Sequence, residues 1–295
     1  MEPEVIAMHV DLSDGRRLDV QVAGPAGGFP LVYHHGAPGA AVLYHPMVAA
    51  AARHGLRTVI YARPGYGHST ASPGRVVADA AADTAAVLDA LGLGEFLTVG
   101  WSGGGPHALA CATLLPGRCL GAATIGGVAP FTASGLDWTA GMGADNIEEF
   151  GAAVRGDPAL TKYLQAQADV LRTVTASDLV AALGDLVSDV DRRQLTGGFA
   201  RYMAESFRTA VTAGIAGWHD DDLAFVGDWG FEPRAGCPVA VWQGDQDRMV
   251  PYSHGQWLAA RVPGVRAHLL PGHGHLSLLG DAFDDILDDL VANRA

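Results

Sequence analysis

Positive charge is scarce in this 295-residue sequence: Lys162 is the only lysine, and 19 basic side chains stand against 32 acidic ones. The formal net charge of −13 disfavours a polyanionic partner, so DNA- and RNA-binding proteins are excluded first. Charged residues make up only 17% of the chain and hydrophobic residues 49%, which excludes a disordered protein. A chain of this length buries a large core, in one large domain or two modest ones.

Cysteine is also scarce. Cys111, Cys119 and Cys237 show no C-x-x-C pairing, which fits neither a disulfide framework nor a zinc site. We therefore expect all three to pack as small apolar residues.

Long unbroken apolar runs are missing as well. Residues 96–117 and 119–136 are uncharged, but glycines and prolines interrupt both, so we expect no membrane-spanning helix. Near the N-terminus, Glu2, Glu4 and Asp11 stand where a secretory signal would carry basic residues before an apolar run. We expect no such signal in the chain as given, and a cytoplasmic location.

Short strand-like and helix-like runs alternate along much of the chain. The strand-like runs are residues 5–10, 18–22, 31–34, 58–61, 96–99, 120–125, 238–242 and 265–270. The helix-like runs are residues 46–54, 76–91, 106–115, 253–261 and 282–292. This alternation predicts an α/β fold with a mostly parallel central sheet flanked by helices on both faces. The aspartates of residues 281–289 lie off the apolar face of the last run, which predicts a solvated acidic surface.

Residues 131–231 interrupt this alternation with helical patterns and no convincing strand. We therefore predict a core made of residues 1–130 and 232–295, with residues 131–231 inserted as a helical cap. An apolar stripe with a spacing of four inside the insertion indicates packing rather than a ligand site; it consists of Phe199, Met203, Phe207 and Val211. The acidic residues 220–222 predict a solvated helix start rather than a metal site, because consecutive carboxylates cannot all face one ion.

The segment Gly100-Trp101-Ser102-Gly103-Gly104 follows one apolar strand directly and precedes a helix. This is the strand, turn and helix context of the G-x-S-x-G motif, in which a serine at the tip of a strained turn exposes its hydroxyl. Glycines two residues before and after it let neighbouring chains approach without Cβ clashes. The motif makes Ser102 a candidate nucleophile.

A nucleotide-binding interpretation competes for the same stretch, because residues 103–108 satisfy G-x-G-x-x-A after a strand. It requires an acidic residue about twenty positions later to bind a ribose, and residues 119–136 contain none. No lysine follows a glycine run, so a phosphate-binding loop of the G-x-x-x-x-G-K type fails too. Nucleotide binding is therefore the weaker interpretation.

A serine nucleophile needs a base and an acid that orients the base. Residues 244–251 form an acidic loop after one predicted strand, with Asp245 and Asp247 as candidates, and residues 271–275 form a histidine loop after the next, with His273 and His275. The carboxyl ends of parallel strands share one edge of the sheet, so these loops and Ser102 are expected to converge there. The order Ser, Asp, His is the one associated with this architecture.

Five motifs in this order resemble the α/β-hydrolase fold serine hydrolases of the capped, alpha/beta hydrolase fold-1 type. They are His35-Gly36-Ala37-Pro38-Gly39, Arg63-Pro64-Gly65-Tyr66-Gly67-His68-Ser69, the Ser102 segment, Gly244-x-x-Asp247-x-x-Val250-Pro251 and Gly274-His275. The resemblance covers nearly the whole length outside the insertion. The usual aspartate before R-P-G-x-G is Ala62 here, a departure in a structural loop.

The resemblance implies Ser102 as nucleophile, Asp247 as triad acid and His275 as general base, with the backbone N–H groups of Ala37 and Gly103 as the oxyanion hole. It favours Asp247 over Asp245 and His275 over His273.

Hydrolysis of a carboxylic ester through an acyl-enzyme is the first expectation from this resemblance, with neither a cofactor nor a metal. Peptidase, carbon–carbon bond hydrolase, thioesterase and lyase activities remain open on the same triad, as does a slow-turnover ligand receptor. We expect a small, moderately apolar substrate under the helical insertion. The substrate-binding candidates are Trp101, Phe131, Trp138 and Met142, with Phe150, Tyr163 and Trp218 as further aromatic residues that can line the crevice.

Overall fold

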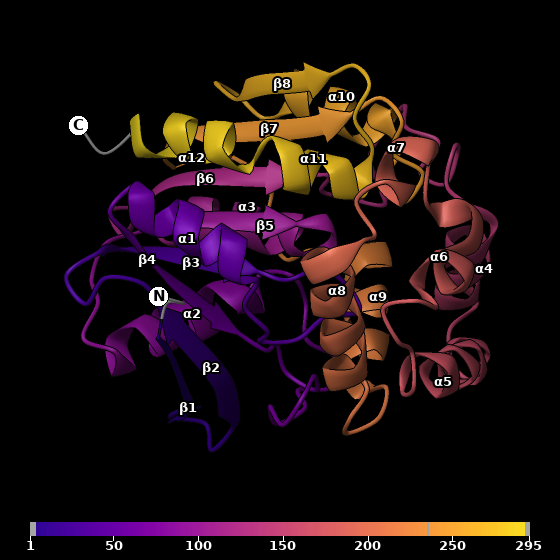
Figure 1. Ribbon diagram of the computed structural model, residues 1–295, viewed down its shortest axis with the longest axis horizontal. Helices are drawn as coiled ribbons and strands as arrows, with labels where there is room; N and C mark the ends of the chain where they lie inside the picture. The colour runs from indigo at the N-terminus through magenta and orange to yellow at the C-terminus, as the bar shows by residue number, and fades with distance from the viewer. Residues whose placement is uncertain (1–3, 235, 293–295) are drawn as a thin grey trace.

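The computed structural model describes residues 4–234 and 236–292, and its centre is an eight-stranded sheet with the order β1-β2-β4-β3-β5-β6-β7-β8 (Figure 1). Glu2 lies outside the described residues. The strands are β1 (Val5–Asp11), β2 (Arg17–Ala23), β3 (Phe29–His34), β4 (Leu56–Tyr61), β5 (Phe96–Trp101), β6 (Cys119–Ile125), β7 (Val239–Gly244) and β8 (Arg266–Leu270). The predicted α/β fold is confirmed.

The sheet is antiparallel only at its N-terminal edge. Strand β2 pairs antiparallel with both β1 and β4, whereas the pairs from β4 through β3, β5, β6 and β7 to β8 are all parallel. The carboxyl ends of the parallel strands therefore share one edge, where the loops after β3, β5, β7 and β8 meet.

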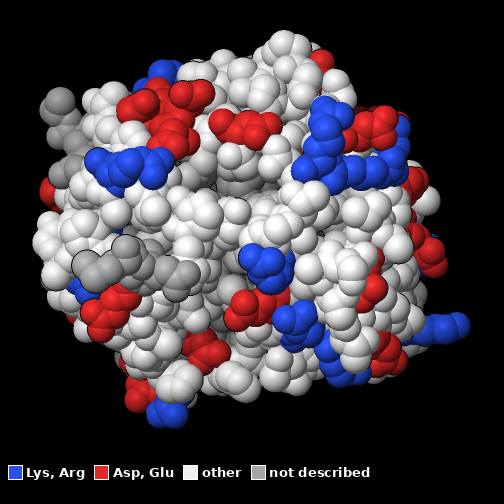
Figure 2. Space-filling model, in the orientation of Figure 1, with Lys and Arg blue, Asp and Glu red and all other residues white. Residues whose placement is uncertain are grey.

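Helices cover both faces of the sheet (Figure 1). One face carries α1 (His45–Arg53), α11 (His275–Asp281) and α12 (Phe283–Val291), and the other carries α2 (Asp79–Ala90), α3 (Gly105–Leu114) and α10 (Tyr252–Arg261). Helix α12 buries Phe283, Ile286, Leu287 and Leu290. Its acidic residues gather on the surface at the upper left of Figure 2, so the predicted solvated face is confirmed.

Between β6 and β7 the described chain contains helices and no strand, as predicted. They are α4 (Ala144–Arg155), α5 (Ala159–Leu171), α6 (Leu179–Leu183), η2 (Gly184–Leu186), α7 (Asp189–Arg192), α8 (Gly197–Ala210) and α9 (Ala216–Val226). We call α4 to α9 the helical insert. It lies beyond the carboxyl edge of the sheet, at the right of Figure 1.

The core lies on both sides of the central strands. Every residue of β5 is buried, as expected for a strand covered by helices on both faces. Helix α3, which follows it, buries eight of its ten residues because it packs against the sheet through small side chains. The central strand and the helix thus form a rigid support for the turn that joins them.

The described part of the chain bears on three further expectations. No helix there is both long and apolar enough to cross a membrane. Cys111, Cys119 and Cys237 are free thiols, the first two buried. Basic and acidic side chains are interspersed on the face shown in Figure 2, between wide uncharged areas.

Candidate active site

Ser102 stands at the turn between β5 and α3, in the short 3-10 helix η1 (Ser102–Gly104). It is the only residue other than glycine with a positive φ in the described chain, at 57°. This left-handed conformation is strained for a serine and stays in place because the surrounding structure fixes it. A side chain at Gly100 would overlap the carbonyl oxygen of Gly104, so the turn tolerates only glycine there. The sequence motif and the backbone agree.

His275 and Asp247 form a buried pair from two different loops. His275 Nδ1 lies 2.7 Å from Asp247 Oδ2, and the other oxygen, Oδ1, accepts the backbone N–H groups of Met249 and Val250 at 2.9 and 2.8 Å. These bonds keep the carboxylate facing the imidazole, which therefore carries its proton on Nδ1. The ring nitrogen Nε2 has no hydrogen-bond partner among the described residues.

The environment of His275 favours its protonated form. Burial lowers the pKa of the imidazole, but the carboxylates of Asp247 and Asp191 outweigh burial and raise the pKa above 6.5. Room for the pair comes from Gly126, where a Cβ would stand only 2.9 Å from His275 Nδ1 and 3.1 Å from Asp247 Oδ2. Gly126 follows β6 and has a φ of 53°. Glycine is therefore favoured here for two reasons: the left-handed backbone and the lack of space for a Cβ.

One cavity brings the predicted groups together. Ser102 and His275 line it, and so do Ala37 and Gly103, whose backbone N–H groups are the predicted oxyanion hole. A Cβ at residue 103 would be 3.2 Å from the Ala37 nitrogen, so the two backbones run close together. No hydrogen bond joins Ser102 to His275 among the described residues. Catalytic contacts of this kind often form only with substrate bound.

The loop that carries Ala37 is held by Arg63. Its guanidinium donates to the carbonyl oxygens of His35 and Gly36 at 2.6 and 3.0 Å, and its backbone N–H donates to His35 Nε2 at 3.2 Å. The other imidazole nitrogen, Nδ1, then carries the proton and donates to the Gly36 oxygen at 2.7 Å. Two segments far apart in sequence thus fix the backbone next to Ser102.

Asp221 of α9 connects this loop to the helical insert. It pairs with Arg63 Nη2 at 2.5 Å and with Arg75 Nη1 at 2.6 Å, and all three side chains are buried. Burial acts to raise the pKa of Asp221, but the two guanidinium groups hold it well below its ordinary value. The prediction of a solvated helix start at residues 220–222 is therefore wrong: the three aspartates are buried in the middle of α9.

The described chain has no cluster of His, Cys, Asp and Glu side chains suited to a metal ion.

Asp191 of α7 is a second connection that the sequence analysis missed. Its carboxylate accepts the backbone N–H groups of His275, Leu276 and Ser277 at 3.0, 2.9 and 2.8 Å. These are unpaired donors of the first turn of α11, so a residue 84 positions upstream of His275 acts as the cap of this helix. The sequence predicted a loop at His275, but the structure shows the first residue of a helix. Only the pairing across the fold reveals this cap.

The four predicted substrate-binding residues are divided. Trp101 lines the cavity, with its indole 5.3 Å from the imidazole of His275. Phe131, Trp138 and Met142 do not line it, and the expectation for them is corrected: they pack in a hydrophobic cluster where Trp138 contacts Phe131 edge to face and donates to a backbone oxygen. Trp138 packs edge to face on Phe150 of α4, and of the two it is Phe150 that lines the cavity.

Other residues of the insert line the cavity instead of Phe131, Trp138 and Met142. Phe150, Tyr163 and Trp218 line the cavity as the sequence analysis allowed, joined by Met203 and Phe207 from the stripe predicted as packing.

The alternative candidates for the base and the acid, His273 and Asp245, do not line the cavity. His273 contacts the Pro271 oxygen at the surface, and Asp245 is exposed and accepts the Gly272 N–H.

The chain matches a family model described as the alpha/beta hydrolase fold over residues 30–282. A non-heme chloroperoxidase of Streptomyces lividans is 33% identical over 152 residues, which are 51% of this chain and 55% of that protein. The match thus spans about half the length of that relative. A non-heme haloperoxidase of Rhodococcus erythropolis is 27% identical over 270 residues, covering 90% of this chain and 92% of that protein.

Solved structures share the fold at low sequence identity. An enol-lactonase from Burkholderia xenovorans superimposes with a TM-score of 0.66 at 20% identity, over 97% of this chain and all of the other. A carboxylesterase from Bacillus subtilis gives 0.66 at 18% identity, over 99% and 92% of the two chains. An epoxide hydrolase from Vigna radiata gives 0.69 at 15% identity, over 99% and 98%. At these identities the likeness concerns the fold alone.

Proposed function

Because this chain belongs to the alpha/beta hydrolase fold family, we propose that it is a hydrolase of carboxylic esters, with Ser102 as nucleophile, His275 as general base and Asp247 as the acid that orients it. The observation that carries the proposal is the buried Asp247–His275 pair: His275 lines the same cavity as Ser102, and its Nε2 has no partner among the described residues. The esterase and lactonase names among the fold neighbours agree with this choice.

The reaction begins when His275 Nε2 takes the proton of the Ser102 hydroxyl and the serine oxygen bonds to the ester carbonyl carbon. The carbonyl oxygen then carries the negative charge of a tetrahedral intermediate. Collapse of the intermediate breaks the bond to the alcohol, which leaves with the proton from His275, and an acyl group stays on Ser102. Water, deprotonated by the same imidazole, attacks the acyl-enzyme and releases the carboxylic acid.

The negative oxygen needs donors that are already in place. The N–H groups of Ala37 and Gly103 are assigned this role, and the loss of one such donor costs about 3 to 4 kcal/mol of activation free energy. Arg63 supports the Ala37 side through its bonds to the oxygens of His35 and Gly36. A side-chain substitution at Ala37 leaves its N–H in place. Substitution of Arg63 is therefore the better way to disturb this loop.

A fluorophosphonate probe together with a chromogenic acyl ester tests the proposal. We expect one label per chain and many turnovers, with labelling lost and kcat reduced by about 10⁶-fold in Ser102→Ala. Trp138→Phe, which changes an aromatic residue outside the cavity, is the matched control and keeps both. A slow-turnover receptor would instead bind the ester saturably, with the residual turnover unchanged in Ser102→Ala. That outcome would overturn the proposal.

Matched amides and thioesters then separate the remaining hydrolase activities. We expect esters to be cleaved faster than amides, because an alcohol is a better leaving group than an amine. A preference for amides at equal acyl length would replace the esterase assignment with a peptidase one on the same residues.

A further inference from the structure

The wall of the cavity that belongs to the insert carries an unusual concentration of carboxyl groups. Asp145 and Glu149 of α4 and Asp222 of α9 all line it, whereas no lysine or arginine of the described chain does. The rest of that wall is mostly apolar, with side chains such as Phe150, Met203 and Phe207. Neither the Ser102 chemistry nor the packing of α9 on Arg63 uses these three acids.

Asp222 is fully buried, and its carboxyl oxygens have no N–H or hydroxyl donor in the described chain. Their hydrogen-bonding neighbour is another acid, the carboxyl group of Glu149. Its neighbour Glu149 is partly satisfied, because the Trp218 indole N–H donates to Oε1 at 2.7 Å. A buried carboxyl group without a donor is costly and rare in folded proteins. Two neighbouring buried acids that can pair with each other only through a shared proton therefore point to a donor that arrives with the ligand.

The two acids also influence each other. Burial raises the pKa of Glu149 to about 7, and burial together with the adjacent Glu149 carboxyl raises that of Asp222 well above its ordinary value. The two groups therefore retain a proton near neutral pH unless a cation compensates their charge. A ligand with several N–H donors and a positive charge satisfies both requirements.

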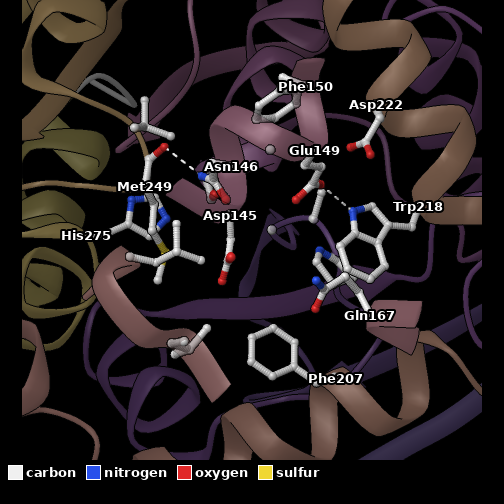
Figure 3. A pocket seen from close by; sticks show the side chains of 18 of the residues that line it. Asp145, Asn146, Glu149, Phe150, Gln167, Phe207, Trp218, Asp222, Met249 and His275 are labelled. Carbon is white, nitrogen blue, oxygen red and sulfur yellow. Dashed lines mark hydrogen bonds between the residues drawn. The ribbon is translucent and has the colours of Figure 1, made fainter. Parts of the chain in front are cut away.

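The position of the acids limits the shape of this ligand. In Figure 3, His275 stands at the left of the cavity, Trp218, Asp222 and Gln167 at the right, and Asp145 and Glu149 between them. Phe207 lies along one side. A molecule that reaches from the catalytic end to Glu149 and Asp222 runs along Phe207, which favours an apolar chain between its two ends. The Trp218 ring beside Glu149 adds a face that favours a cation.

We propose that the cavity binds substrates in which an apolar chain separates the ester from an ammonium group, and that Glu149 and Asp222 hold this ammonium group. The reaction at the ester end rests on the proposed function, but the binding of the amine does not. Anions are disfavoured by the three carboxyl groups, and neutral ligands bring no positive charge to compensate Glu149 and Asp222.

Binding is measured first on Ser102→Ala, by calorimetry with hexylamine, 1-hexanol and hexanoate at pH 7.5. We expect the amine to bind at least about tenfold more tightly than the alcohol and hexanoate to bind most weakly, since a charge-assisted hydrogen bond discriminates by this factor or more. Equal affinity for the amine and the alcohol, or tightest binding of hexanoate, overturns the proposal.

Substitutions then locate the selectivity. In the Ser102→Ala background, Glu149→Gln and Asp222→Asn should reduce the advantage of the amine over the alcohol to about twofold or less. Glu148→Gln is the matched control: it neutralises an exposed acid on the same helix and should leave the advantage intact. Retained selectivity in both cavity variants contradicts the assignment. If Asp222→Asn does not fold in a thermal melt, the comparison of the three ligands still decides.

Kinetics of the unmodified protein separate this proposal from the esterase proposal. With nitrophenyl esters of 6-aminohexanoic and hexanoic acids, we expect a kcat/KM at least about tenfold higher for the amino ester, through a lower KM. Selective amine binding without turnover of either ester refutes the esterase proposal and supports the amine site. Equal Ser102-dependent turnover of both esters, with no selectivity in calorimetry, refutes the amine site and supports the esterase.

Discussion

The sheet core and the helical insert contribute buried aspartates of different kinds to the same site. Asp247, which follows β7, contacts the imidazole of His275 and belongs to the proposed catalytic groups. Asp191 and Asp221 of the insert contact the supports of those groups: the backbone of α11 and the guanidinium of Arg63. The comparison teaches that the insert does more than cover the cavity, because it also helps to hold the core elements that carry the proposed catalytic residues.

Adjacent positions on one helix show the same division within the insert. Asp221 is ionised between Arg63 and Arg75, whereas Asp222 faces the Glu149 carboxyl group and has no N–H donor in the described chain. The next residue along a helix points about 100° away, so α9 turns one acid to the sheet loops and the other to the cavity. One acid stabilises the fold and the other is available for a ligand.

The largest effect is expected from the core acid. Asp247→Asn should lower kcat by about 10,000-fold, because the amide no longer keeps the imidazole in the required tautomer. Asp245→Asn, in the same loop but exposed, is the matched control and should retain kcat. Steady-state kinetics on a chromogenic ester measure both. If the two variants lose activity equally, Asp247 has no special role and its assignment as the acid that orients His275 is wrong.

A large effect on stability is expected from the insert acid beside the arginines. Asp221→Asn leaves two buried guanidinium groups without their counter-charge and should lower the free energy of unfolding by about 3 to 5 kcal/mol. Urea denaturation measures this. The control is Asp169→Asn, which breaks only an exposed pair with Arg172 and should change stability little. An unchanged urea midpoint in Asp221→Asn would contradict the assigned role.

A smaller effect, on pH dependence, is expected from Asp191. His275 acts as a base only when neutral, so kcat/KM rises with pH through its pKa. The carboxylate of Asp191 helps to raise that pKa, and its removal in Asp191→Asn should move the acid limb to lower pH. The loss of charge-assisted bonds to α11 should also cost about 2 kcal/mol of stability.

The exposed Asp189 of the same short helix supplies the matched control, and Asp189→Asn should keep both the pH profile and the stability. A pH limb that stays in place in Asp191→Asn, or moves to higher pH, would show that Asp191 does not influence the imidazole as inferred.

The smallest effect concerns the apolar wall. Phe207→Leu removes contact area inside the cavity and should lower kcat/KM for a hexanoate ester by about fivefold, equivalent to about 1 kcal/mol. Phe131→Leu, outside the cavity, should leave it unchanged. Comparable losses in both variants would place the acyl chain somewhere other than beneath the insert.

Local pattern was sufficient for the core of the site. The strand before Ser102 and the glycines around it specify the turn from adjacent residues, and the loops of Asp247 and His275 follow strands whose carboxyl ends must share an edge. The insert offered no such rule. Phe131, Trp138 and Phe150 are equally aromatic in the sequence, and only the packing of the helices decides which of them reaches the cavity.

The contacts of Asp191 and Asp221 depend on residues 84 and 158 positions away. One signal for the second was present: Arg63 and Arg75 stand in a mostly uncharged region, and buried guanidinium groups require a carboxylate. The acidic run of α9 was a candidate for this partner. For Asp191 the sequence contains no comparable signal, since its partners are backbone groups.

The two tethers from Asp191 and Asp221 also restrict how a reactant enters and a product leaves. A hinge motion of the whole insert would break two sets of contacts at once. Arg63 and Arg75 would lose the carboxylate of Asp221, and the first turn of α11 would lose the carboxylate of Asp191. Passage is then expected through local rearrangement of insert helices other than α7 and α9, which carry the tethers. The rate of turnover would then depend on this local opening, while the rest of the insert stays in place.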